Sequence, residues 1–165
     1  MQKRVFSLLV DNTAGVLSRI SGLFSRRGYN IDSLSVGVTA DERFSRMTVV
    51  CSGDILILEQ IRKQLAKLVD VRDIKILDLE DSVIRELVMV KVAASREQRQ
   101  GIISIADIFR AKVVDVSKDS LIVEMTGTKS KLEAFIDLMG DYEILELART
   151  GVTGLSRGAG DVRFF

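Results

Sequence analysis

The apolar residues of this chain show the same succession of strand and helix patterns in both halves. This repeat limits the possible folds more than any other feature of the sequence. In each half, a strand-like apolar run is followed by a helical stripe, two further strand patterns, a second stripe and a last strand. Each half thus predicts the order β-α-β-β-α-β, the split-βαβ or ferredoxin-like arrangement. We therefore expect an α+β protein built from two ferredoxin-like βαββαβ domains in tandem.

The first half is predicted in most detail around its first helix. Asn12 or Thr13 suits the N-cap position, and Gly28 suits the end of the helix after two arginines. The expected elements are, in order, a strand at 3–10, a helix that starts after Asn12 or Thr13 and ends at Gly28, strands at 30–38 and 45–52, a helix from 54 and a strand at 71–79.

The second half repeats this order. Ser95 and Gln98 form a capping-box pattern before a helix, and Thr128 is expected to cap the next helix, which Gly140 ends. The expected strands are 84–94, 112–117, 121–126 and 142–149.

The domain boundaries follow from these patterns. We expect a first domain at 3–79, a linker at 80–83 within a short acidic stretch, a second domain at 84–150, and a glycine-rich tail without periodicity at 151–165. In the usual strand order of this fold, 4-1-3-2, the second strand lies at an edge of the sheet. Joining the same edge of a second copy is one way to cover it, so we expect a homodimer.

The composition removes several classes of function. The 165 residues include no histidine and one cysteine, Cys51, so histidine-based nucleophilic catalysis, a structural zinc site and an internal disulfide are not expected. The net charge is +1, which gives no electrostatic reason to expect nucleic acid or an anionic membrane as a partner. With no signal-peptide pattern and no apolar run of about 18 residues, we expect a cytoplasmic protein. Carboxylates and lysines leave catalysis open on composition, but its usual machinery is missing, so we expect neither a catalytic residue nor a metal.

The segment from Asp11 to Asn30 is the candidate binding site. It predicts a tight loop that opens onto a helix, and free N–H groups at a helix start suit a carboxylate or a phosphate. Other interpretations stay open on these residues alone. Asn12 is also an ordinary N-cap, Gly15 a small residue in a first turn, and Asn30 a turn residue after Gly28.

The chain closely resembles the regulatory, small subunit family of acetolactate synthase, also called acetohydroxyacid synthase. The resemblance covers nearly the whole chain in order. Its first part resembles an ACT domain, an amino-acid-binding module that works as a dimer. The segments that carry it include Asn12-x-x-Gly15-Val-Leu-x-Arg19-Ile, Gly22-Leu-Phe-x-x-Arg27-Gly-Tyr-Asn30-Ile, Ile108-Phe-Arg110 and Gly151-Val-x-Gly-Leu-Ser-Arg-Gly158.

The resemblance implies a function without an active site on this chain. Members of the family bind a separate catalytic large subunit that uses thiamine diphosphate, magnesium and FAD. They raise its activity and make it sensitive to feedback inhibition, usually by valine and sometimes by leucine or isoleucine. The resemblance also implies that Asn12 and Gly15 belong to the effector loop, and that Asn30 and Ile31 contact the effector from the neighbouring protomer.

The chemistry of these residue types fits a free amino acid. The loop from Asn12 to Gly15 can meet the carboxylate with backbone N–H groups, and the oxygen of Asn30 can accept from the ammonium group. Val16 and Ile31 could line a small apolar pocket for the side chain, where about 1.5–3 kcal/mol is available from burial.

Two other functions are compatible with this order of elements. RNA-recognition domains share the topology, but the third strand pattern, Met47 to Cys51, carries no aromatic ring for base stacking. A stand-alone enzyme would have to form acetolactate from pyruvate without a large subunit.

Overall fold

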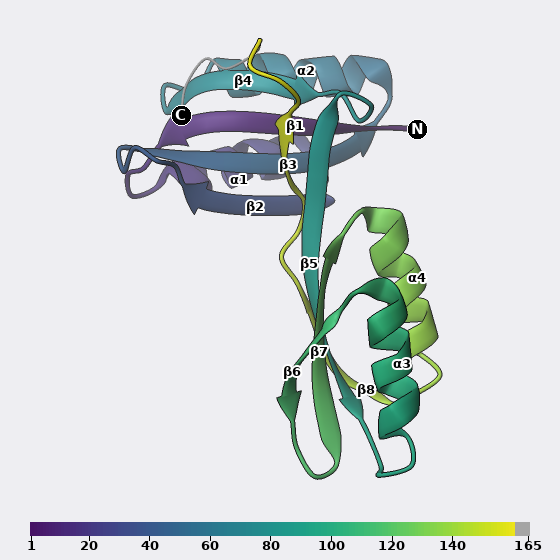
Figure 1. Ribbon diagram of the computed structural model, residues 1–165. Helices are drawn as coiled ribbons and strands as arrows, with labels where there is room; N and C mark the ends of the chain where they lie inside the picture. Colours follow the sequence, from purple (N-terminus) through teal and green to yellow (C-terminus); the bar gives the residue numbers. More distant parts are fainter. Residues whose placement is uncertain (161–165) are drawn as a thin grey trace. The chain divides into compact units, whose positions relative to one another are not determined.

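Each half of the chain forms an antiparallel four-stranded path with two helices in the computed structural model, which describes residues 1–160 (Figure 1). In the first half the strand order is β2-β3-β1-β4, with β1 and β3 in the middle and β2 at an edge. The elements are β1 (Gln2–Asp11), α1 (Val16–Arg27), β2 (Ser33–Val38), β3 (Phe44–Gly53), α2 (Ile55–Ala66) and β4 (Val71–Leu77).

The second half has the same topology, with the strand order β6-β7-β5-β8. The α+β class, the tandem arrangement and the predicted strand order are therefore confirmed. The elements are β5 (Ser82–Ala93), α3 (Arg99–Phe109), β6 (Lys112–Val116), β7 (Ser120–Gly127), α4 (Lys129–Met139) and β8 (Ile144–Arg149).

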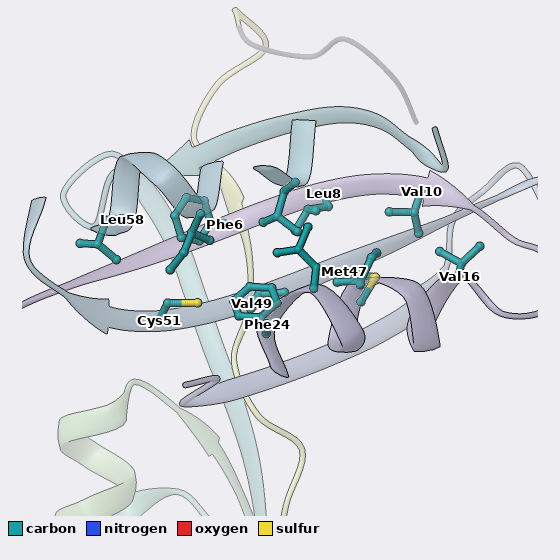
Figure 2. Close-up of a cluster of buried hydrophobic side chains, with 13 residues drawn as sticks. Phe6, Leu8, Val10, Val16, Phe24, Met47, Val49, Cys51 and Leu58 are labelled. Carbon is teal, nitrogen blue, oxygen red and sulfur yellow. The ribbon is translucent and has the colours of Figure 1, made fainter. Parts of the chain in front are cut away.

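The core of the first unit lies between its sheet and its helices. The apolar side chains of β1 and β3 that point to one face pack against the stripes of α1 and α2, and Figure 2 shows this cluster. Phe6, Leu8 and Val49 are fully buried there. The period of two along the strands and of 3.6 along the helices puts these residues on facing surfaces.

The second unit is built in the same way. Val88, Val90 and Val92 alternate along β5 and pack with Ile102 and Phe135 from the two helices. Ser95 and Gln98 form the predicted capping box, in which each backbone N–H donates to the other residue's side chain. Phe109 and Phe135 meet edge to face, with ring centroids 5.6 Å apart.

The chain divides into compact units near the predicted boundary, with differences on both sides. The first unit runs from Met1 to Ile84, and the second from Arg85 to Gly151. Strand β5 already begins at Ser82, inside the predicted linker at 80–83, because Ser82 is buried and its neighbours continue the extended pattern.

The predicted tail at 151–165 also differs from expectation over its described part. Residues 152–160 belong to the first unit, and they include a short strand, β9 (Thr153–Ser156), that pairs with β5. The backbone N–H of Val152 donates to Ser33 and its carbonyl accepts from Ser35, at 2.7 Å each. These bonds cannot be predicted from spacing, because more than a hundred residues separate the partners. Residues 161–165 lie outside the described part of the chain.

A core truncation tests the packing of the first unit. We expect Phe6→Ala to lower the free energy of unfolding by about 3–5 kcal/mol, because the fully buried ring leaves a cavity between β1 and the helices. Urea unfolding followed by circular dichroism measures this loss. Leu56→Ala is the control, since that leucine is 73% exposed on α2 and its loss is expected to change little. Equal effects of the two substitutions would contradict this core.

Candidate functional site

The loop from Asn12 to Gly15 is held by backbone bonds to both neighbours of the central strand. The N–H of Asp11 donates to the carbonyl of Asp70 (2.9 Å), and the N–H of Asn12 donates to the carbonyl of Arg43 (2.8 Å). The Asn12 side chain adds a bond from Nδ2 to the carbonyl of Glu42 (2.8 Å). The loop is therefore tied to the turn between β2 and β3.

Helix α1 begins later than predicted. Its N-cap is Gly15, with φ of +86°, and not Asn12 or Thr13. The left-handed conformation at this position favours glycine, so the chain turns there and enters the helix at Val16. Among the described residues, no side chain caps this helix start. Its first N–H groups are therefore available to an anion, as the sequence suggested.

Arg19 lies over the loop from one turn further along α1. Its Nε and Nη2 donate to the two carboxylate oxygens of Asp70, at 2.6 and 3.0 Å. Its third nitrogen, Nη1, lies 2.8 Å from the place that a Cβ on Gly15 would occupy. Hence Nη1 is not used by Asp70 and sits beside the start of the helix.

Asp70 is the partner that orients Arg19. It is 7% exposed, and the hydrogen bonds from Arg19 lower the pKa of its carboxyl group. A buried carboxylate needs such a partner, so Asp70 is ionised and holds the guanidinium in a fixed plane.

Two more ion pairs flank the loop. Arg72 donates to the carboxylate of Asp11 at 2.7 and 2.9 Å. At the β2–β3 turn, side-chain bonds from Arg43 lower the pKa of Asp41 to about 2. Asp11, Asp41 and Asp70 are thus each paired with an arginine.

Val16 and Ile31, which are expected to line an apolar pocket, have different surroundings in the structure. Val16 is 4% exposed and packs into the core of the first unit, at the end where Figure 2 shows Val10. The contacts of its side chain are therefore made by the core of its own chain. Ile31 is partly buried and packs against the same cluster from its outside.

Asn30 precedes β2 and is exposed. Its Nδ2 donates to Asp32 Oδ1 (2.9 Å), which leaves its carbonyl oxygen as the free end of the amide. Asp32 is in turn held by its backbone N–H on the carbonyl of Val50 (2.8 Å) and by the hydroxyl of Ser52. The expected second strand consequently begins at Ser33 and not at Asn30.

The two groups of predicted site residues lie at opposite ends of β3. The backbone N–H of Asn12 donates to the carbonyl of Arg43, and the backbone N–H of Asp32, two residues after Asn30, donates to the carbonyl of Val50. These seven residues of extended chain span about 23 Å at about 3.3 Å per residue. The structure therefore does not bring Asn12 and Asn30 together within one chain.

Sequence reasoning missed Arg19 and Asp70 as neighbours of the loop. The signal for Arg19 was its spacing, because a helical side chain four residues after Gly15 points back toward that turn. Asp70 had no comparable signal, since it comes from the far side of the sheet.

Other parts of the described chain offer little chemistry. Burial raises the pKa of the Cys51 thiol to about 12, so this buried strand residue is a poor nucleophile. Within residues 1–160 there is no group of three metal-ligating side chains, and no helix is both long and apolar enough to cross a membrane.

The Arg19–Asp70 pair predicts a pH dependence. Because the pKa of Asp70 is lowered in the folded state, the pair stabilises the protein above the ordinary aspartate value of about 3.9. This contribution is lost as the pH falls through the lower folded-state pKa. We expect Arg19→Gln to be less stable than the wild type near pH 7, with a difference that shrinks below about pH 4.

The measurement is the free energy of unfolding in urea at several pH values. Arg27→Gln is the matched control, since this exposed arginine on the same helix has no partner among the described residues. A difference between wild type and Arg19→Gln that stays constant down to low pH would contradict the role of Asp70.

Comparisons with known proteins agree on one family. A family model described as an AHAS small subunit-like ACT domain matches residues 6–73, and one for the small subunit of acetolactate synthase matches residues 85–158. Together they span both units.

Individual relatives match along nearly their whole length. The chain is 50% identical over 157 residues to a probable acetolactate synthase small subunit of Archaeoglobus fulgidus, covering 94% of this chain and 98% of the relative. It is 52% identical over 154 residues to the small subunit of Mycolicibacterium smegmatis, covering 92% and 89%. A crystal structure of the small subunit from Thermotoga maritima superimposes with a TM-score of 0.90 at 39% identity, covering 96% and 99%.

The match extends over both units, over the loop at Gly15 and over the fold as a whole. It leaves the RNA-binding and stand-alone-enzyme interpretations without support. The chain belongs to the family of acetolactate synthase small subunits, which are regulatory and not catalytic.

Proposed function

We propose that this protein binds the catalytic large subunit of acetolactate synthase, raises its activity and makes it sensitive to feedback inhibition by a branched-chain amino acid, with valine as the first candidate. The effector site lies at the interface of a homodimer and uses Asn12, Gly15, Val16, Asn30 and Ile31. The observation that carries this proposal is the placement of Asn12 and Asn30 at opposite ends of an edge strand.

Pairing of two β2 edges brings the separated halves together. Within residues 1–160, β2 pairs with β3 alone, and Val36 and Val38 on it are 49% and 58% exposed. Two copies related by a two-fold axis align these edges antiparallel. The start of β2 in one copy, after Asn30, then lies beside the end of β2 in the other, where its Asn12 loop is tied to the turn.

Each part of a free amino acid has a partner in such a site. The carboxylate faces the uncapped N–H groups at the start of α1 and the free Nη1 of Arg19. The ammonium group donates to the free carbonyl oxygen of Asn30 from the other copy. Ile31 supplies apolar contact, and Val16 supports the loop from the core.

The site can discriminate among branched-chain effectors only weakly, because their side chains differ little in size. Valine and leucine differ by one methylene group, which is worth about 1–3 kcal/mol in an apolar pocket. We therefore expect overlapping responses to valine, leucine and isoleucine, with one of them preferred.

Regulation follows from the shared site. An effector shifts a conformational equilibrium only when it binds one arrangement better than another. A ligand held by two protomers senses their relative placement, and a coupling of about 1–3 kcal/mol is ordinary. Thiamine diphosphate, magnesium and FAD belong to the catalytic subunit in this proposal, and this chain holds none of them.

Subunit complementation tests the shared site. We expect Asn12→Ala and Asn30→Ala each to weaken valine binding, measured by calorimetry, by about tenfold. Asn30→Ala removes the acceptor for the ammonium group, and Asn12→Ala removes the bond to the Glu42 carbonyl that holds the loop in place. When the two variants are mixed and allowed to exchange subunits, each mixed dimer regains one site with both asparagines intact. Half of the dimers are mixed at equal amounts, so about a quarter of the sites recover wild-type affinity.

The outcomes separate the alternatives. No recovery on mixing, with both single variants weakened, would mean that one chain forms the site alone. Unchanged affinity in both single variants would remove the site assignment. Gln100→Ala, an exposed amide on α3 of the second unit, is the control and should bind valine as the wild type does.

An activity titration tests the regulatory role. We expect the small subunit to raise acetolactate formation by the purified large subunit in a saturable way, and valine to inhibit only the combined enzyme. Gly15→Asp should still activate but should lose inhibition by valine, because a carboxylate at a position with φ of +86° strains the loop and repels the effector carboxylate. Inhibition that persists in this variant would contradict the placement of the effector.

A further inference from the structure

An open cavity of about 490 Å³ lies in the second unit. Arg96 and Arg99 line it from the start of α3, and Val116, Ser117 and Lys118 line it from the end of β6 and the following turn. Figure 1 shows both segments at the same lower end of this unit. Three of the five lining residues are cationic, and none is acidic.

Among residues 1–160, the cations that line this cavity form no ion pair with a carboxylate. Over residues 1–160, the side chains of Arg96 and Lys118 make no hydrogen bond or ion pair. The nearby carboxylate of Asp115 accepts from the hydroxyl of Ser117 (3.2 Å) and not from a cation. This differs from the first unit, where Arg19, Arg43 and Arg72 each have a carboxylate partner.

Arg99 ties the two walls of the cavity together. Its Nη2 donates to the carbonyl of Lys118 (2.6 Å) and to that of Ser117. Its Nε is buried and has no hydrogen-bond partner among the described residues. A guanidinium usually meets a carboxylate or a phosphate, whereas the hydrogen bonds of Arg99 among the described residues go to backbone carbonyls, so its charge has no ion-pair partner there.

From these observations we infer that the cavity binds a small phosphorylated molecule. Three cations near the positive end of α3 call for a ligand with at least two negative charges. The cavity is larger than inorganic phosphate requires and falls in the size range of small-molecule sites. Val116, which is 61% exposed, offers apolar contact to an organic part of the ligand.

A free amino acid fits this cavity poorly. Its ammonium group would face three cations, and no carboxylate lines the cavity to accept from it. The backbone carbonyls of Ser117 and Lys118 already accept from Arg99. The site is therefore chemically distinct from the proposed valine site, and it does not depend on that proposal.

Calorimetry on the full chain at constant ionic strength tests the inference, with ribose 5-phosphate and pyrophosphate as probes and inorganic phosphate for comparison. We expect saturable binding of ribose 5-phosphate at one site per chain, several-fold tighter than inorganic phosphate. Arg96→Gln and Lys118→Gln should each weaken it about three- to tenfold. These side chains have no protein partner, so their replacement leaves the fold intact.

Lys131→Gln is the matched control, because it removes one positive charge from an exposed position on α4 of the same unit. Its affinity for ribose 5-phosphate should equal that of the wild type. Valine binding should be unchanged in all three variants. An equal loss of affinity for ribose 5-phosphate in Lys131→Gln would overturn the inference. So would a lack of saturable binding of both ribose 5-phosphate and pyrophosphate.

Discussion

The pairing of β1 with a neighbour on each side is the constraint on which the first unit depends. A central strand must satisfy its backbone groups on both edges, because a buried N–H or carbonyl without a partner is costly. At the end of β1 this pairing continues through Asp11 to Asp70 and through Asn12 to Arg43. The loop that follows is therefore anchored from two sides before any side chain contributes.

This anchoring explains how the loop presents backbone N–H groups. Gly15 adopts a left-handed conformation that lets the chain turn sharply into α1, and no side chain takes up the first donors of the helix. The Asp70 carboxylate holds Arg19 above them. Uncapped backbone N–H groups and the Arg19 guanidinium thus lie together at the start of α1.

The two units share a topology but treat the corresponding helix start differently. In the second unit, Ser95 and Gln98 exchange hydrogen bonds between backbone N–H groups and side chains in the turn that leads into α3, and α3 then begins at Arg99 with Gln98 as its N-cap. The cations gather instead at Arg96, Arg99 and Lys118, where side chains and not backbone groups line the cavity. One topology therefore carries two different arrangements of donors.

The sequence by itself determined the order of elements, because periods of two and 3.6 mark strands and helices wherever one face is buried. It also pointed to the loop at Gly15, through residue types that suit a tight turn before a helix. It misplaced the start of α1 at Asn12 or Thr13, since an N-cap preference cannot reveal a positive φ three residues later.

Only the tertiary structure decided which distant residues meet. Three contacts join segments that are far apart in the chain. They are the ion pair of Arg19 with Asp70, the hydrogen bonds of Val152 with Ser33 and Ser35, and the pairing of strand β9. The separation of Asn12 from Asn30 along β3 was likewise decided by the tertiary structure. Local spacing encodes which face of an element is apolar, but contacts across a sheet depend on register and on the packing of the whole unit.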